Sequence, residues 1–191
     1  RHPRQGLTVT DCIFMSSRDG LNWDKCDEAI FKPGMEYEGN WAYGTAYPWY
    51  HMIETPTEDG YNTELSMFMS IKKVGEIDGE KERIDHIYRF TLRRDGFACY
   101  KANYNCAKVV TKPFKFVGSD LYINFSTSAK GYIFITIKDE EGRIAKTCEL
   151  FGDSDNRLVH FENVPTKEFS ERTVTLEFEL RDAEIYAFEF K

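Results

Sequence analysis

Residues 174–181 read Val-Thr-Leu-Glu-Phe-Glu-Leu-Arg, and this stretch decides the fold class. Apolar residues alternate with polar ones, which is the period of a β-strand that buries one face. The same alternation recurs at residues 65–71, 88–93, 121–125, 133–137 and 185–190. Turn-forming sequences separate these runs at residues 94–96, 117–120, 129–131, 139–142 and 151–153. We therefore expect an all-β chain with under about a tenth of its residues in helices.

The spacing of these strands predicts two parts. After about residue 105 the strands and turns are compact and regular, as in antiparallel sandwiches and barrels. Before that point long aromatic and polar loops separate the strands, and the polar segment 74–85 is expected to be a hairpin loop. We predict β-hairpins over residues 1–105 and an antiparallel β-sandwich of the jelly-roll type over residues 106–191.

Composition excludes several functional classes. The net charge of the 191 residues is −7 and no basic stripe is present, so no nucleic-acid partner is expected. No apolar stretch approaches the length of a membrane span, and no cofactor motif occurs. The five cysteines form no Cys-x-x-Cys pair and are expected to be reduced and mostly buried. This odd number, with no visible signal peptide, favours a cytoplasmic location.

An early hairpin carries a motif. Residues 16–23 read Ser-Ser-Arg-Asp-Gly-Leu-Asn-Trp and follow the apolar run 12–15. The pair Asp19-Gly20 predicts a tight turn between two strands, and Trp23 is expected to fold back over that turn in a structural role. The pattern resembles the Asp-box hairpin, Ser-x-Asp-x-Gly-x-x-Trp, of sialidase-like β-propellers, except that the aspartate and glycine are adjacent here.

A series of motifs carries a wider resemblance. They lie, in order, at residues 14–23, 31–34, 39–41, 47–48, 92–97, 111–114, 124–131 and 178–188. The series resembles the C-terminal portion of uncharacterised bacterial proteins related to glycoside hydrolases, with a five-bladed propeller of the invertase and arabinanase type followed by a β-sandwich. The resemblance implies that residues 1–105 are propeller-blade-like hairpins. The blades that supply most catalytic carboxylates in that family have no counterpart here, so no catalytic residue can be assigned.

The best candidate for a binding site is the segment 40–51. Sugars present apolar C–H faces ringed by hydroxyls, so a sugar site needs aromatic platforms beside hydrogen-bonding groups. The alternative is that these aromatic side chains pack the loop against neighbouring strands. Exposure of Trp41, Tyr47 and Trp49 would favour binding, and their burial would favour the structural role. The candidate residues are Asn40, Trp41, Tyr43, Tyr47, Trp49, Tyr50 and His51.

Two acidic groups are further candidates. Asp153 and Asp155, with Asn156, could offer oxygen ligands to calcium, but they equally suit a solvated turn, and we expect no metal site. Hydrolysis of a glycoside needs two carboxyl groups about 5–10 Å apart. The second acidic cluster flanks the aromatic segment 40–51 and could contain such a pair of carboxyl groups. It comprises Glu54, Glu58, Asp59 and Glu64.

Together these observations favour a carbohydrate-associated accessory or glycan-binding module that contacts an oligosaccharide or polysaccharide. A structural, self-associating module without a ligand is the alternative, and a glycosidase that acts with residues from the missing blades is the third. The run 65–71 is apolar on both faces. Such a strand needs covering on both sides, so a homodimer or the missing blades are the expected partners.

Overall fold

The computed structural model describes residues 11–32, 46–77 and 79–191. The chain divides into two compact units, Arg1–Leu92 and Arg93–Lys191. Strands dominate both units, and the only helix in the described ranges is the four-residue 3₁₀ turn η1 (Thr166–Phe169). The expected all-β class with little helix is therefore confirmed. No helix in the described ranges is long and apolar enough to span a membrane.

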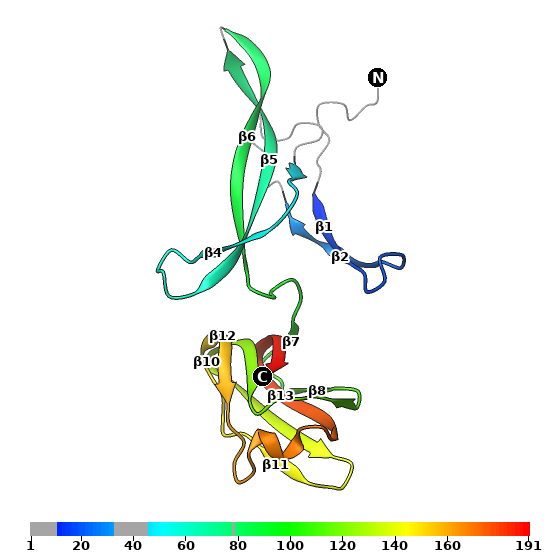
Figure 1. The fold of residues 1–191 in the computed structure, drawn as a ribbon. Helices are drawn as coiled ribbons and strands as arrows, with labels where there is room; N and C mark the ends of the chain where they lie inside the picture. Colours follow the sequence, from blue (N-terminus) through cyan, green and yellow to red (C-terminus); the bar gives the residue numbers. More distant parts are fainter. Residues whose placement is uncertain (1–10, 33–45, 78) are drawn as a thin grey trace. The chain divides into compact units, whose positions relative to one another are not determined.

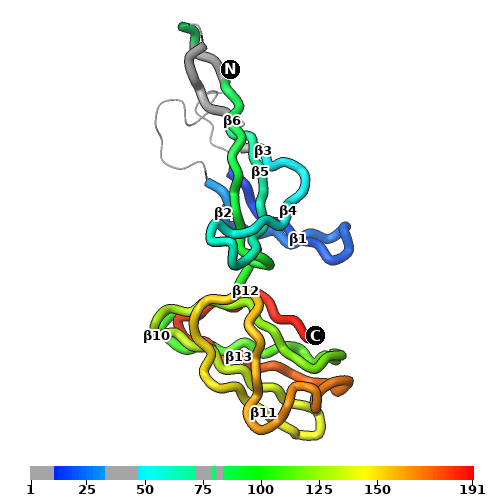
Figure 2. Tube along the Cα trace, turned by 60° about the vertical axis from the view of Figure 1, so that its left-hand side comes forward, coloured from blue at the N-terminus to red at the C-terminus, as the bar shows by residue number. Residues whose placement is uncertain are grey.

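The second unit is one antiparallel sheet of seven strands built on two long ones (Figure 1). β10 (Leu121–Asp139) and β13 (Thr173–Phe190) pair along nearly their whole length. The other edge of β13 carries β7, β8 and β9 in turn, and the other edge of β10 carries β11 and β12. Figure 2 shows β10, β11, β12 and β13 of this unit in a rotated trace. Their bounds are β7 (Tyr100–Ala102), β8 (Ala107–Val110), β9 (Phe114–Lys115), β11 (Ile144–Lys146) and β12 (Asp153–Val159).

The pairing of the two long strands is broken once near its middle. Thr127 lies opposite Ala183 and Tyr132 opposite Arg181, so residues 128–131 of β10 face only Asp182. Asp182 has a positive φ of 44°. The break shifts the alternation of β13, whose buried residues before it are Val174, Leu176, Phe178 and Leu180 and after it are Ala183 and Ile185. Such an irregularity bends a sheet and increases its twist.

One hydrophobic core fills the second unit. Side chains from both halves of the long strands meet there, together with Phe161 and Phe169 from the segment around η1. Phe178 is 2% exposed, whereas its neighbour Glu177 points to the other face and pairs with Lys108. The predicted alternation of this strand is thus confirmed. All seven strands belong to one hydrogen-bonded sheet, so the sandwich type is not confirmed.

The first unit contains two smaller antiparallel sheets. β1 (Cys12–Ser16) pairs with β2 (Asp24–Phe31), which confirms the strands expected around Asp19. In the other sheet β5 pairs with three strands, and β5 and β6 form a long hairpin. The predicted loop 74–85 is therefore wrong, because the strands continue to Ile77 and resume at Glu80. The bounds are β3 (Ala46–Pro48), β4 (Ile53–Pro56), β5 (Thr63–Ile77) and β6 (Glu80–Arg93).

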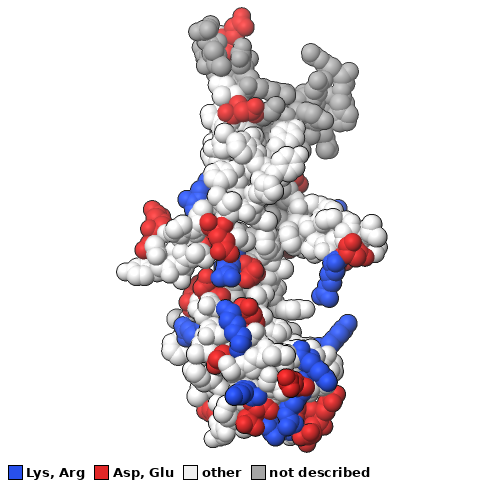
Figure 3. Space-filling view, in the orientation of Figure 1, with Lys and Arg blue, Asp and Glu red and all other residues white. Residues whose placement is uncertain are grey.

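The first unit buries little apolar surface in its described part. Met69 is its only apolar residue there that is buried, at 1% exposure. Its neighbours on β5, Leu65, Met67 and Phe68, are half-buried. On the view in Figure 3 charged side chains are interspersed over the second unit, whereas the described surface of the first is largely uncharged. Most of the large apolar side chains in the described part of the first unit are therefore at least partly exposed.

Candidate ligand-binding face of the first unit

Pairing of β3 with β5 places four side chains on one face of the sheet. Tyr47 lies opposite Ser70, and the Trp49 N–H donates to the carbonyl of Phe68 at 2.8 Å. Cross-strand partners share a face, whereas Met69 points to the opposite one. We call Tyr47, Trp49, Phe68 and Ser70 the aromatic face.

The ring of Trp49 is held in a fixed orientation. Its Nε1–H donates to Oγ of Ser70 at 2.8 Å, and its ring centroid lies 6.4 Å from that of Phe68. Trp49 nevertheless remains 48% exposed, and Tyr47 is 51% exposed. An exposed indole that is already oriented loses little side-chain freedom when a ligand stacks on it.

A polar network continues this face along the sheet. Ser66 shares its side of β5 with Phe68, and its fully buried hydroxyl accepts from Nε of Arg89 at 2.8 Å. Nη2 of Arg89 also bonds Glu64 at 2.6 Å and the Thr55 hydroxyl at 3.0 Å. The Arg89 side chain remains 46% exposed. The network therefore fixes a guanidinium group at the surface of the sheet that carries the aromatic face.

The structure brings together part of the predicted site. Tyr47 and Trp49 lie on the aromatic face, and both side chains are about half exposed. Tyr50 is 94% exposed, and the exposed His51, with φ of 68°, also lies in the connection from β3 to β4. The remaining predicted residues lie outside the described part of the chain; these are Asn40, Trp41 and Tyr43.

Several residues of this face could not be selected from the sequence. Phe68, Ser70 and Arg89 lie far along the chain from Trp49, on β5 and β6. Their proximity depends on strand pairing, which only the register reveals. The alternation of residues 65–71 is the one signal in the sequence that could have grouped Ser66, Phe68 and Ser70 on a common side.

Among the acidic candidates beside this segment, Asp59 and Glu64 make contacts that can be described in detail. Asp59 accepts hydrogen bonds from the Thr57 hydroxyl at 2.5 Å and from the Tyr61 N–H at 3.0 Å, and these bonds lower the pKa of its carboxyl. They order the turn between β4 and β5. Glu64 binds Arg89, as described above. Glu54 and Glu58 are exposed.

The carboxylate of Asp153 is engaged by contacts within the second unit. The Asp153 carboxylate binds Nη1 of Arg93 at 2.5 Å and the Ser126 hydroxyl at 3.2 Å. Asp155 and Asn156 lie farther along β12. In the part of the chain that the structure describes, no three His, Cys, Asp or Glu side chains are placed to hold a metal ion. Asp153 thus anchors the arginine that begins the second unit.

The turn at Asp19 is organised by its carboxylate. Oδ1 accepts from the N–H groups of Asn22 at 2.7 Å and Leu21 at 2.8 Å, and Oδ2 accepts from the Asn22 amide at 2.7 Å. The bonds from Asn22 and Leu21, with that from Ser17, hold the pKa of Asp19 well below its usual range. Trp23 is 55% exposed, so the expectation that it folds over this turn receives little support.

The cysteines are less buried than expected. Cys12 is partly buried and the other four are exposed, which corrects the prediction of mostly buried thiols. All five are free. The Cys148 thiol donates to Glu162 at 3.0 Å, and this contact raises the pKa of the thiol.

Comparisons with protein-family models, with curated proteins and with solved structures gave no match.

Proposed function

We propose that the chain is a carbohydrate-associated accessory module that binds an oligosaccharide or polysaccharide through the aromatic face. The observation that carries this proposal is the half-exposed indole of Trp49, fixed by its hydrogen bond to Ser70. A flat, oriented ring suits the apolar C–H face of a pyranose. Tyr47 extends the platform, and Arg89 offers donors to ring hydroxyls. The motifs that resemble glycoside hydrolase-related proteins support the same substrate class.

Replacing Trp49 with alanine should weaken binding of the best oligosaccharide by about tenfold, because an aromatic contact contributes about 0.5–1.5 kcal/mol and 1.4 kcal/mol is a factor of ten. Titration calorimetry with a panel of plant and bacterial oligosaccharides measures this. Ser70→Ala, which releases the indole, should weaken binding less.

Trp23→Ala is the matched control. Trp23 is similarly exposed, at 55%, but lies beside the β1–β2 turn rather than on the aromatic face. The control should bind as the unmodified chain does. Equal losses in both variants, or no heat with any saccharide, would contradict the proposal.

A purely structural module that self-associates is the second candidate. It is favoured by the large apolar side chains exposed in the first unit, where Met69 is the only buried apolar residue of the described part. Exposed apolar side chains of this size can be covered by a second copy of the chain. They include Leu21 at 84%, Ile30 at 49%, Met52 at 45% and Ile87 at 60% exposure.

Light scattering over a concentration series tests self-association. A closed two-fold dimer should show twice the monomer mass, with a largely apolar interface above about 1,000 Å². Ile30→Glu places a charge on β2 and should shift the equilibrium toward monomer. Phe151→Glu in the second unit, where Phe151 is 65% exposed, is the control that should leave the mass unchanged. A strict monomer at high micromolar concentration would exclude this alternative.

A further inference from the structure

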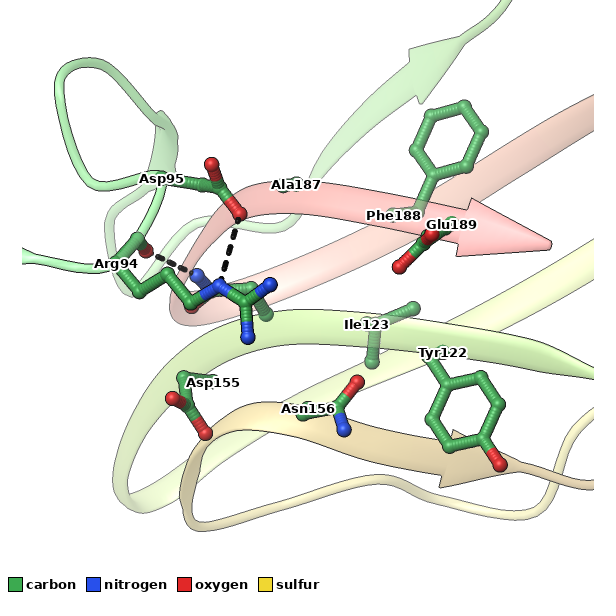
Figure 4. Close-up of a pocket in the computed structure, with 10 residues that line it drawn as sticks. Arg94, Asp95, Tyr122, Ile123, Asp155, Asn156, Ala187, Phe188 and Glu189 are labelled. Carbon is green, nitrogen blue, oxygen red and sulfur yellow. Dashed lines mark hydrogen bonds and ion pairs between the residues drawn. The ribbon is translucent and has the colours of Figure 1, made fainter. Parts of the chain in front are cut away.

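A groove of about 380 Å³ crosses three neighbouring strands of the second unit (Figure 4). β10 forms its floor, β12 and β13 form its sides, and the segment after β6 lies at one end. Tyr122 and Asn124 alternate with the core residues Leu121, Ile123 and Phe125, so they face away from the core. The groove is therefore an external feature of the sheet.

A small residue opens the groove, and a buried amide makes its floor rigid. Ala187 of β13 lies opposite Asn124, in line with the bulkier Glu189, which lies opposite Tyr122. Asn124 is 3% exposed, and both ends of its amide are engaged. Its Oδ1 accepts from Nε of Arg93 at 2.5 Å, and its Nδ2 donates to the carbonyl of Arg94 at 2.6 Å. The segment that closes the groove is thus tied to the floor.

The walls present several hydrogen-bonding groups. Figure 4 shows the carboxylate of Asp155 and the amide of Asn156 on one wall and the guanidinium of Arg94 reaching over the floor. Nε of Arg94 lies 4.0 Å from Asp95. The carboxylate of Glu189 lies on the opposite wall, from β13. Acceptors therefore lie on both sides of the hollow, and donors come from Asn156 on one side and from Arg94 at the end.

Charge in the groove is nearly balanced. Asp95 pairs with Arg94, and Glu189 pairs with Lys191 at 3.1 Å. Asp155 has no ion-pair partner in the described ranges, so one negative charge is in excess. This excess disfavours phosphate and uronate ligands. No set of three metal-ligating side chains is present among the described residues, so a cation site is not indicated either.

We propose that this groove binds a neutral, polyhydroxylated ligand of the saccharide class. Hydroxyl groups can donate to Asp155 and accept from Arg94 and the Asn156 amide, while the space over Ala187 admits one ring. The site lies in the second unit and does not rest on the function proposed for the aromatic face. The chain would then contact carbohydrate at two independent points.

Amide chemical shifts of the ¹⁵N-labelled full chain test the proposal. Titration with neutral hexose and pentose oligosaccharides should shift the amides of residues 94–95, 122–124, 155–156 and 187–189. A uronate oligosaccharide and spermidine are the charged comparison arms and should leave these amides unchanged. Preferential shifts with either charged probe, or no groove shifts with any neutral saccharide, would overturn the proposal.

Ala187→Leu fills the hollow and should weaken binding at the groove by at least about tenfold, which the same titration measures. Thr175→Leu is its control, because Thr175 lies on the same strand, alternates with buried Val174 and Leu176, and lines no part of the groove. Equal weakening in both variants would contradict the assignment.

Two further variants separate the outcomes. If Ala187→Leu does not fold, Asn156→Ala changes an exposed residue of the wall and should weaken binding in the same direction. An unchanged affinity in Asn156→Ala would then count against the groove. Trp49→Ala should leave the groove shifts intact, so failure of one site is distinguishable from failure of the other.

Discussion

Phe178→Ala should lower the free energy of unfolding of the second unit by roughly 3–5 kcal/mol, the usual cost of emptying a buried phenylalanine site. Phe178 is 2% exposed and lies between Ile135 of β10 and Val109 of β8. Its ring centroid is 5.7 Å from that of Phe188. At Phe178, β13 is hydrogen-bonded to β10 on one side and to β8 on the other. These pairings hold the backbone in place, so the neighbouring side chains cannot easily move in to fill the cavity. Urea unfolding monitored by circular dichroism measures the change.

Glu177→Ala is the matched control on the adjacent position. Glu177 points to the solvent face and pairs with Lys108 at 2.6 Å, with both side chains substantially exposed. Exposed pairs contribute little, so the change should stay within about 0.5 kcal/mol. Comparable losses in both variants would mean that β13 does not have the register described above.

The alternation of residues 174–181 was enough to predict this strand, because a strand with one buried face repeats every two residues. The two-residue period was less successful at predicting where a strand ends. Residues 121–125 and 133–137 were expected as separate strands with a turn at 129–131. The structure joins them into β10, because the irregularity opposite Asp182 inserts residues without ending the pairing. The turn-forming residues 129–131 lie inside this irregularity, so they interrupt the pairing without ending the strand.

The candidate site was predictable only in part, for a related reason. The density of aromatic residues in segment 40–51 pointed to Tyr47 and Trp49. Ser70 orients the indole of Trp49, and Arg89 supplies the charged group on that face. Both contacts arise from pairing with β5, and sequence patterns do not give the register of strands far apart in the chain. The groove at Ala187 likewise combines four separate segments.

Gly131→Ala should destabilise the second unit by about 3 kcal/mol, at the upper end of the usual cost of overpacking. A Cβ at this position would lie 2.2 Å from the carbonyl oxygen of Asp182 and 2.9 Å from that of Arg181. Both atoms belong to the backbone of β13, so no side-chain rotation can relieve the overlap. The two long strands would have to separate at the break that bends the sheet.

Gly142→Ala distinguishes this steric cost from a conformational one. Gly142 has φ of 88°, but no atom lies within 4 Å of a Cβ built there, so alanine would cost only about 1–2 kcal/mol of backbone strain. Urea unfolding of both variants should therefore rank Gly131→Ala as the more damaging, although its φ lies outside the left-handed region. The opposite ranking would show that β10 and β13 are not in close contact at the break. The bend would then depend on the conformation of Asp182 alone, and a glycine at position 131 would not be required for it.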